Sequence, residues 1–283
     1  MLFTIIIKLI PFSSLKIFFL RFKGAKIGEN VKIGYLSTIH SSDYSKITIG
    51  DFVQIGYNSN IKVSKLNIGN FSIVGNNAQI DGGGELIVGR GCYIPGLFID
   101  TSGGVLVGNF SALPPNGNIY SHNYSRTWYN PGSKYELYNI NIGNRVWMGA
   151  GSSLLNANIG DETLIAAGSI VLQDIPKNSF AIGNPARVLK TNTYNKIDKT
   201  LFENKIFQND IIKSYGQNKI LFVNDFNEIM SNIDVVVCNI CSINPKKVNA
   251  TILEIDKSHI HNMKKEVLST VKELRSWGIF LSY

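Results

Sequence analysis

The sequence predicts a mainly β fold in which residues 25–190 wind into a three-sided coil of short parallel strands. A branched aliphatic residue followed by glycine recurs in this region, mostly at intervals of 17 to 22 residues. A second aliphatic residue follows six positions after each of these, and a small or turn-forming residue comes next. No amphipathic helical period occurs between residues 25 and 118, which excludes an alternating α/β fold.

The repeat predicts how the coil is packed. The aliphatic–glycine pairs are Ile27-Gly28, Ile49-Gly50, Ile68-Gly69, Val88-Gly89, Val107-Gly108, Ile142-Gly143 and Ile159-Gly160. The aliphatic residues six positions later are Ile33, Ile55, Val74, Ile94, Leu113, Met148 and Ile165. A period of six with three sixes per unit puts one aliphatic side chain on each of three faces, stacked on its counterpart in the next unit. Gly, Asn and Asp are frequent because corners need tight or positive-φ turns.

The first 24 residues are predicted to form a helical cap on the coil. Residues 2–22 are strongly apolar, but Lys8, Pro11 and Lys16 interrupt them. A transmembrane helix needs about 20 clean apolar residues, and no signal-peptide cleavage site follows. We therefore expect two short helices around Pro11 that cover one end of the core. The alternative is a peripheral contact with a membrane surface.

Residues 191–283 predict a small α+β domain whose role the sequence leaves open. Strands are expected at 219–223, 234–238, 251–255 and 279–283, and helices at 201–214 and 261–277, in a split βαβ order. Cys238, Cys241, His259 and His261 have the ligand types of a zinc site. Because a lone CxxC is weak and the His-x-His spacing is unusual, we expect no metal.

Composition narrows the functional classes. The net charge of +8 suits a partner that carries phosphates or carboxylates. No dense stripe of Lys and Arg occurs, so nucleic acid is not expected as a partner. The three cysteines are too few for a disulfide scaffold, which favours the cytoplasm, with membrane association as the alternative.

The segment 142–190 contains the elements VWMGAG, IAAGS, DIP and GNPAR. With the repeat, these make roughly residues 20–190 resemble the hexapeptide-repeat acyltransferases, especially the maltose, galactoside and polysaccharide O-acetyltransferases. The resemblance implies a left-handed parallel β-helix and a homotrimer with sites between subunits. It also implies acetyl-CoA as co-substrate, a sugar or polysaccharide acceptor, and no metal.

The resemblance implies that His122 is the catalytic base. The family places its catalytic histidine just before a long loop, and His122 precedes the excursion 123–139. An imidazole suits this role because it titrates near neutral pH. His40, in another insertion, is the alternative. Some relatives have an acid before the histidine where this chain has Ser121, so a backbone carbonyl, Asp100 or Asn116 is left to orient the ring.

The remaining site residues form two sets. The resemblance implies contacts with acetyl-CoA at Trp147, Met148, Gly149, Ala150, Ala167, Gly168, Pro185, Arg187 and Lys190. A backbone N–H between Met148 and Ala150 would stabilise the thioester oxyanion. The acceptor set is Asp100, Asn116, Tyr124, Arg126, Trp128 and Tyr129. The loop aromatics either stack on sugar rings or pack on a neighbouring subunit.

The expected function is transfer of an acetyl group from acetyl-CoA to a sugar hydroxyl of a bacterial-type surface polysaccharide or its precursor. The main alternative is N-acetylation of a nucleotide-linked amino sugar. A small-molecule acyltransferase and a non-enzymatic scaffold are weaker alternatives. The chemistry of the product, ester or amide, discriminates the first two.

Overall fold

The computed structural model describes residues 7–123 and 136–191 and four strands in the remainder of the chain. Two compact units divide after Tyr194, close to the predicted boundary at residue 190. Several predictions concern residues outside the described ones. They are the loop side chains Tyr124, Arg126, Trp128 and Tyr129, the helix at 201–214, the helix at 261–277 except for its first residue, and the strand at 279–283.

The first unit is a solenoid of three parallel sheets, which confirms the predicted coil. Sheet A contains β1 (Lys26–Ile27), β4 (Ile47–Ile49), β7 (Lys65–Ile68), β10 (Glu85–Val88), β13 (Val105–Val107) and β17 (Ile140–Ile142). Sheet B contains β2 (Lys32–Ile33), β5 (Gln54–Ile55), β8 (Ile73–Val74), β11 (Tyr93–Ile94), β18 (Trp147–Met148), β20 (Leu164–Ile165), β22 (Ser179–Gly183) and β23 (Ala186–Thr191), its two parts joined through Ala112. Sheet C contains β3 (Thr38–His40), β6 (Asn60–Lys62), β9 (Gln79–Asp81), β12 (Phe98–Asp100), β14 (Asn118–Tyr120), β19 (Ser153–Leu155) and β21 (Ile170–Val171).

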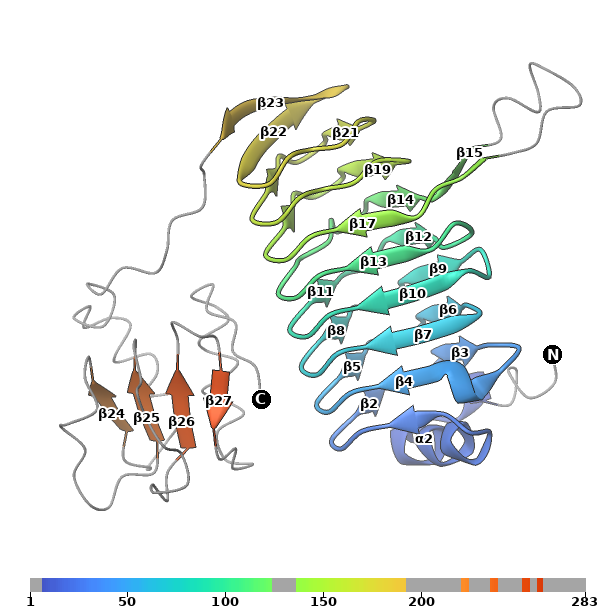
Figure 1. The fold of residues 1–283 in the computed structure, drawn as a ribbon. Helices are drawn as coiled ribbons and strands as arrows, with labels where there is room; N and C mark the ends of the chain where they lie inside the picture. Colours follow the sequence, from blue (N-terminus) through green and yellow to red (C-terminus); the bar gives the residue numbers. More distant parts are fainter. Residues whose placement is uncertain are drawn as a thin grey trace, which may run out of the picture. The chain divides into compact units, whose positions relative to one another are not determined.

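The chain visits the three sheets in the order A, B, C, and each such turn is called a coil below. Followed upward from the blue end in Figure 1, the chain crosses the front sheet from right to left and returns behind it. This sense of winding makes the solenoid left-handed. All pairs within the three sheets are parallel except β22 with β23, where the chain turns back at the end of the solenoid.

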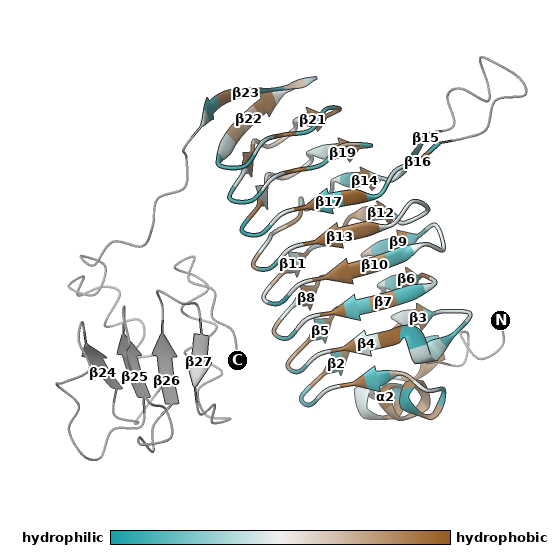
Figure 2. Cartoon of the chain, viewed as in Figure 1, coloured by the Kyte–Doolittle hydropathy of each residue, from teal (hydrophilic) through white to brown (hydrophobic). Residues whose placement is uncertain are grey.

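Aliphatic side chains from successive coils stack inside the solenoid. On sheet A, Ile49 pairs with Ile68, and Ile68 with Val88. Sheet C carries another such ladder, which includes Ile61, Ile80 and Ile99, all at most 1% exposed. In Figure 2 the strands β10 and β13 of sheet A are brown, the colour of hydrophobic residues, and polar segments of the coil are teal. Burial of this continuous apolar column is what holds the coils together.

The corners contain residues that the sequence did not mark. Asn30, Asn58 and Asn77 have positive φ, as expected for turn-forming residues. Phe52, Phe71 and Phe110 also have positive φ, although aromatic residues rarely adopt it. The rings of Phe52 and Phe71 are stacked, with centroids 5.0 Å apart, so packing between coils offsets the backbone strain.

One end of the solenoid is covered by α2 (Ser13–Phe22), which contacts β1 and β2 (Figure 1). Residues 7–9, before Pro11, are also helical, so short helices flank the proline as predicted. Within the part of the chain that the structure describes, no helix has the length and apolar character needed to cross a bilayer.

The second unit contains a four-stranded sheet in the order β24 (Ile220–Val223), β25 (Val235–Cys238), β26 (Thr251–Glu254) and β27 (His259–His261). The first three strands match predicted ones. β24–β25 and β25–β26 are parallel pairs of consecutive strands, so the predicted split βαβ order is wrong. The antiparallel strand β27 was not predicted, and it takes His261 away from the expected helix. Short polar strands such as His-Ile-His lack a clear alternating signal.

Candidate active site

His122 lies where the chain leaves the solenoid. It follows β14 and begins β15 (His122–Asn123), which pairs antiparallel with β16 (Glu136–Leu137). The excursion predicted from the sequence therefore starts and returns at this corner, between sheets C and A. The His122 side chain is 21% exposed, so most of it is buried in the corner while part of the ring is accessible from solvent.

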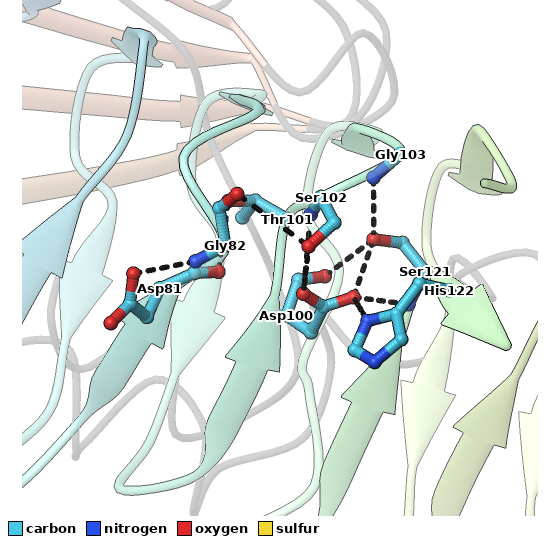
Figure 3. A network of polar contacts seen from close by, with 8 residues as sticks. All are labelled: Asp81, Gly82, Asp100, Thr101, Ser102, Gly103, Ser121 and His122. Atoms are coloured by element: carbon cyan, nitrogen blue, oxygen red, sulfur yellow. Dashed lines mark hydrogen bonds and ion pairs between the residues drawn. The ribbon is translucent and has the colours of Figure 1, made fainter. Parts of the chain in front are cut away.

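Asp100 orients the imidazole. It ends β12, one coil before β14, and its side chain is only 4% exposed. His122 Nδ1 lies 2.6 Å from Asp100 Oδ2 (Figure 3). This resolves the choice left open by the sequence: the partner is Asp100 rather than a backbone carbonyl or Asn116. Asn116 lies at the other edge of sheet C, before β14 begins.

Four further hydrogen bonds hold the same carboxylate. Ser102 donates to Oδ1 from its backbone N (3.2 Å) and its hydroxyl (2.6 Å). Ser121 donates to Oδ2 from its backbone N (2.9 Å), and its hydroxyl lies 2.8 Å away. The Ser121 hydroxyl also lies 2.9 Å from the Asp100 backbone oxygen, so its single proton is shared between two acceptors.

The Ser121 hydroxyl is held in turn by the segment that follows Asp100 in the preceding coil. Gly103 N donates to Ser121 Oγ at 2.9 Å, and Ser121 is fully buried. Figure 3 shows these groups gathered around the carboxylate, with the imidazole at one side. Sequence reasoning noted Ser121 only as a missing acid and did not identify Ser102 or Gly103. The signal that could have found them is their spacing, since each lies a few residues from one member of the Asp100–His122 pair and about one coil from the other.

These contacts decide the charge of Asp100. Burial alone would raise the pKa of this carboxyl, but hydrogen bonds from Ser102, His122 and Ser121 outweigh it and hold the pKa below its ordinary value. Asp100 is therefore ionised at neutral pH and can only accept. The His122 Nδ1 must then carry the proton that it donates, which makes Nε2 the basic nitrogen of the neutral ring.

Four of the predicted acetyl-CoA residues, Ala150, Ala167, Gly168 and Pro185, form a ridge at the corner between sheets B and C, whereas Met148 is 1% exposed and packs in the core. Ala150, Ala167 and Pro185 occupy this corner in three successive coils, and all are exposed. A Cβ added at Gly151 or Gly168 would meet no atom within 4 Å. The ridge is therefore a strip of accessible backbone that a slender ligand can approach closely.

The ridge offers two backbone donors. Of the three N–H groups proposed for the oxyanion, Met148 donates to Ala112 and Gly149 donates to Ile165. Ala150 N, like Ala167 N, makes no hydrogen bond within the described residues. Of the three N–H groups, that of Ala150 is therefore the one left without a backbone acceptor in the described residues. Trp147 is 49% exposed on β18, and Arg187 and Lys190 are exposed on β23.

The imidazole and this ridge lie at opposite edges of sheet C. Ala150 precedes β19, whereas His122 follows the neighbouring parallel strand β14. The intervening strand with its flanking residues spans about 15 Å. One chain therefore does not bring its own His122 and its own Ala150 together.

A polar groove of about 550 Å³ lies at the same corner between sheets B and C as the ridge, in the coils that precede the ridge in the chain. It is lined by amide side chains, among them Asn76, Asn77, Gln79, Asn116 and Asn118, together with Tyr93 and Phe98. Phe98 also contacts Tyr120, two residues before His122, with ring centroids 5.6 Å apart. A larger groove of about 860 Å³ lies at the corner between sheets A and B and contains none of the predicted site residues.

The sequence also suggested His40 as an alternative base and a zinc site in the second unit. His40 ends β3, at the same edge of sheet C as His122 but four strands away in the sheet. Within the described residues, no group of three or more His, Cys, Asp or Glu side chains is arranged to hold a metal. Cys241 of the zinc hypothesis lies outside those residues, so that hypothesis stays untested.

No family model matches the sequence, and no curated protein matches it. Solved structures do resemble it. A UDP-N-acetylglucosamine acyltransferase from Campylobacter jejuni has 21% identity and a TM-score of 0.49 over 67% of this chain and 77% of its own. A point mutant of the Bacillus cereus N-acyltransferase AntD, in complex with dTDP-4-amino-4,6-dideoxyglucose and coenzyme A, has 18% identity and a TM-score of 0.46 over 70% and 97%. A hexapeptide-repeat-containing acetyltransferase from Vibrio cholerae has 17% identity and a TM-score of 0.40 over 67% and 86%.

Proposed function

We propose that this protein transfers an acetyl group from acetyl-CoA to a sugar hydroxyl of a surface polysaccharide or its precursor. The observation that carries the proposal is the buried, ionised Asp100 bound to Nδ1 of a partly exposed His122. A carboxylate in this position fixes the tautomer of a general base. The motifs shared with hexapeptide-repeat acyltransferases and the ridge of small residues support acetyl-CoA as the donor.

The reaction is a direct transfer. Nε2 of neutral His122 takes the proton of the acceptor hydroxyl as the oxygen attacks the acetyl carbonyl carbon. The new C–O bond forms, the C–S bond breaks, and the thiolate of coenzyme A receives the proton from the imidazolium. Asp100 stays ionised throughout and stabilises the imidazolium that forms between these steps. The Ala150 N–H stabilises the negative oxygen of the tetrahedral intermediate.

The ridge suits the pantetheine arm of acetyl-CoA. Amide groups of an extended arm can bond to the backbone N–H groups of Ala150 and Ala167, because small side chains leave the backbone accessible. Trp147 would pack near the thioester, and Arg187 and Lys190 would meet phosphates at the far end. The placement of these residues in consecutive coils supports an arm that runs along the solenoid axis.

The site is completed by a second copy of the chain in a homotrimer. Base and oxyanion donor lie at opposite edges of sheet C, yet the reaction needs both at once: Nε2 must reach the acceptor hydroxyl while that hydroxyl attacks the carbonyl carbon, and the Ala150 N–H must reach the carbonyl oxygen. If the ridge of one copy faces His122 of the next, a closed ring of copies has every site complete.

The acceptor is proposed to be an extended glycan. Amide side chains and aromatic faces, which line the groove, are the groups that bind neutral sugars. From Asn118 at the groove to His122 the strand spans about 13 Å, which is longer than a single hexose ring. A chain of sugars can occupy the groove while another unit of it reaches the imidazole. The loop residues Tyr124, Arg126, Trp128 and Tyr129 stay proposed contacts.

Thiol release from acetyl-CoA tests the function. The protein is incubated with acetyl-CoA and a panel of glycans, free sugars and nucleotide-linked amino sugars, and the product is isolated. Ester formation on a glycan is expected, with a loss of about 10²-fold or more in kcat for His122→Ala. An amide product would favour the alternative N-acetyltransferase. If no acceptor of the panel led to thiol release, or if His122→Ala kept full activity, the proposal would be contradicted.

Mixing two inactive variants tests the shared site. His122→Ala lacks the base, and Ala150→Trp blocks the ridge at an exposed position. When the two are unfolded and refolded together, about a quarter of the sites in random trimers combine an intact base with an intact ridge. Recovery of activity only in the mixture supports the shared site. No recovery, with each variant folded and trimeric, would place both halves in one chain.

A further inference from the structure

The capping helix α2 presents apolar side chains to solvent. The exposed fractions are 67% for Phe12, 41% for Leu15, 60% for Phe18 and 79% for Phe22. These residues are spaced by three, three and four, so they form one stripe along the helix. Lys16, on the opposite side, is fully buried. The inner side of α2 is already apolar, because Leu20 is buried and Ile17 and Phe19 pack against the core, so the outer stripe adds apolar surface that the cap does not use.

The buried cation is explained by the end of the solenoid. The first coil has no coil beneath it, so its backbone groups need other partners. Lys16 Nζ donates to Gly34 O at 2.8 Å and to Ser37 O at 2.9 Å. Arg21 Nη2 donates to Ile27 O at 2.6 Å. The polar residues of α2 are thus used to close the coil.

The apolar stripe has no such role in the solenoid. A cap that ends a solenoid is soluble when its outer face is polar. Here the outer face adds four large apolar side chains, together with Leu9 at 61% exposure. A patch of this kind marks a surface that is covered in the working protein.

The charge around the stripe indicates what covers it. Residues 7–33 contain six cations, of which Arg21, Lys23, Lys26 and Lys32 are exposed, and one acid, Glu29. An apolar stripe bordered by Lys and Arg is the pattern of helices that lie in the interface of anionic bilayers. A second copy of the chain would bring the same cations against each other, which disfavours a dimer through this face.

We propose that α2 lies in the headgroup region of an anionic lipid bilayer, with Phe12, Leu15, Phe18 and Phe22 inserted among the acyl chains. With ten residues, α2 is about 15 Å long and cannot span a hydrocarbon core of about 30 Å. The contact is therefore peripheral. It attaches the first coil, and with it the solenoid, to the surface of the membrane.

Sedimentation with vesicles tests this surface. The full chain is mixed with vesicles of phosphatidylglycerol and phosphatidylcholine in equal parts, or of phosphatidylcholine alone. We expect binding to the anionic vesicles that weakens with salt. Phe18→Ser with Phe22→Ser should reduce the partition coefficient by about tenfold or more. Lys23→Gln with Lys26→Gln should reduce binding to anionic vesicles only.

The control removes two exposed aromatic residues that lie outside α2. Tyr35 and Tyr57 are 48% and 49% exposed, and Tyr35→Ser with Tyr57→Ser should bind vesicles like the wild type. Circular dichroism confirms that each variant is folded. Failure of the wild type to bind, or unchanged binding of the phenylalanine variant, would overturn the proposal. So would a smaller assembly mass for that variant without lipid, which would assign the stripe to contact between copies.

Discussion

The Nδ1 atom of His122 lies 2.6 Å from Oδ2 of Asp100, although 22 residues separate them in the chain. The two residues are neighbours because one coil of the solenoid returns the chain to the same corner. The carboxylate is held by Ser102 and Ser121 before any substrate arrives. The base is thereby preorganised by the fold itself, so changes in the preceding coil should alter its chemistry.

Asp100→Asn is expected to lower kcat by roughly 10²- to 10⁴-fold while the KM for acetyl-CoA stays nearly unchanged. An amide can donate to Nδ1, which moves the ring proton to Nε2 and removes the base. Steady-state thiol release with a glycan acceptor measures both constants.

Asp81→Asn is the matched control for this substitution. Asp81 pairs with Asp100 in the neighbouring strand, but it is exposed and bonded to Lys62 at 3.3 Å. It should keep wild-type kcat. If Asp100→Asn retained kcat within about twofold, the carboxylate would have no part in orienting the base.

The stability of the protein should depend on the charge of Asp100 at acid pH. Its folded pKa lies below the ordinary value of 3.8, so ionised Asp100 stabilises the fold above about pH 4 and loses this effect as pH falls through the folded pKa. The difference in Tm between wild type and Asp100→Asn should not shrink from neutral pH to about pH 5, and it should shrink below about pH 4. Thermal melts at several pH values measure it. A difference that already shrinks near pH 6 would contradict the depressed pKa.

The candidate site could be predicted from the sequence only in part. His122 and the small residues of the ridge stand in motifs, so the resemblance was enough to name them. Asp100 was one of three candidates because nothing near it in the chain marks its role. The signal was its distance from His122, which equals about one coil, but choosing among the three needed the strand register.

The fold was predictable where side chains alternate regularly and less so elsewhere. The aliphatic ladders follow from the period of six. Phe52, Phe71 and Phe110 occupy corner positions where Gly or Asn was expected, because contacts with the next coil decide the residue there. In the second unit, the parallel order of β24, β25 and β26 depends on crossovers that short apolar runs do not specify.

Phe98→Ala should discriminate between long and short acceptors. If the groove holds neighbouring sugars of a glycan, loss of this ring should raise the KM for an oligosaccharide by about tenfold and leave a monosaccharide acceptor nearly unaffected. Tyr57→Ala, an exposed aromatic outside the groove, is the control. Equal losses with both acceptors would show that Phe98 acts on the base and not on the glycan.

Lys16→Met should destabilise the fold by about 2 to 4 kcal/mol in urea unfolding, because two hydrogen bonds from a buried ammonium group are lost. Burial lowers the pKa of Lys16, and removal of this desolvation cost limits the loss. Lys32→Met, at an exposed position in β2, should change stability by about 0.5 kcal/mol or less. A neutral or stabilising Lys16→Met would mean that the first coil needs no cation to close it.

Gly91 and Gly151 separate backbone strain from crowding at the corners. Their φ angles are nearly equal, +66° and +69°, but a Cβ at Gly91 would lie 2.6 Å from the Phe110 ring, whereas one at Gly151 would meet nothing within 4 Å. Gly151→Ala should therefore cost about 1 kcal/mol, from the positive φ alone. Gly91→Ala should cost about 1 to 3 kcal/mol more, because the ring must move out of its packed position.

The extra cost at Gly91 should depend on Phe110. In a Phe110→Leu background the smaller side chain leaves room for the new methyl group, so the two glycine substitutions should cost nearly the same there. Urea unfolding of the single and double variants forms a double-mutant cycle that isolates this coupling. A coupling near zero would mean that the ring is not held over Gly91, and stacking between coils would then not explain why phenylalanine occupies a left-handed corner.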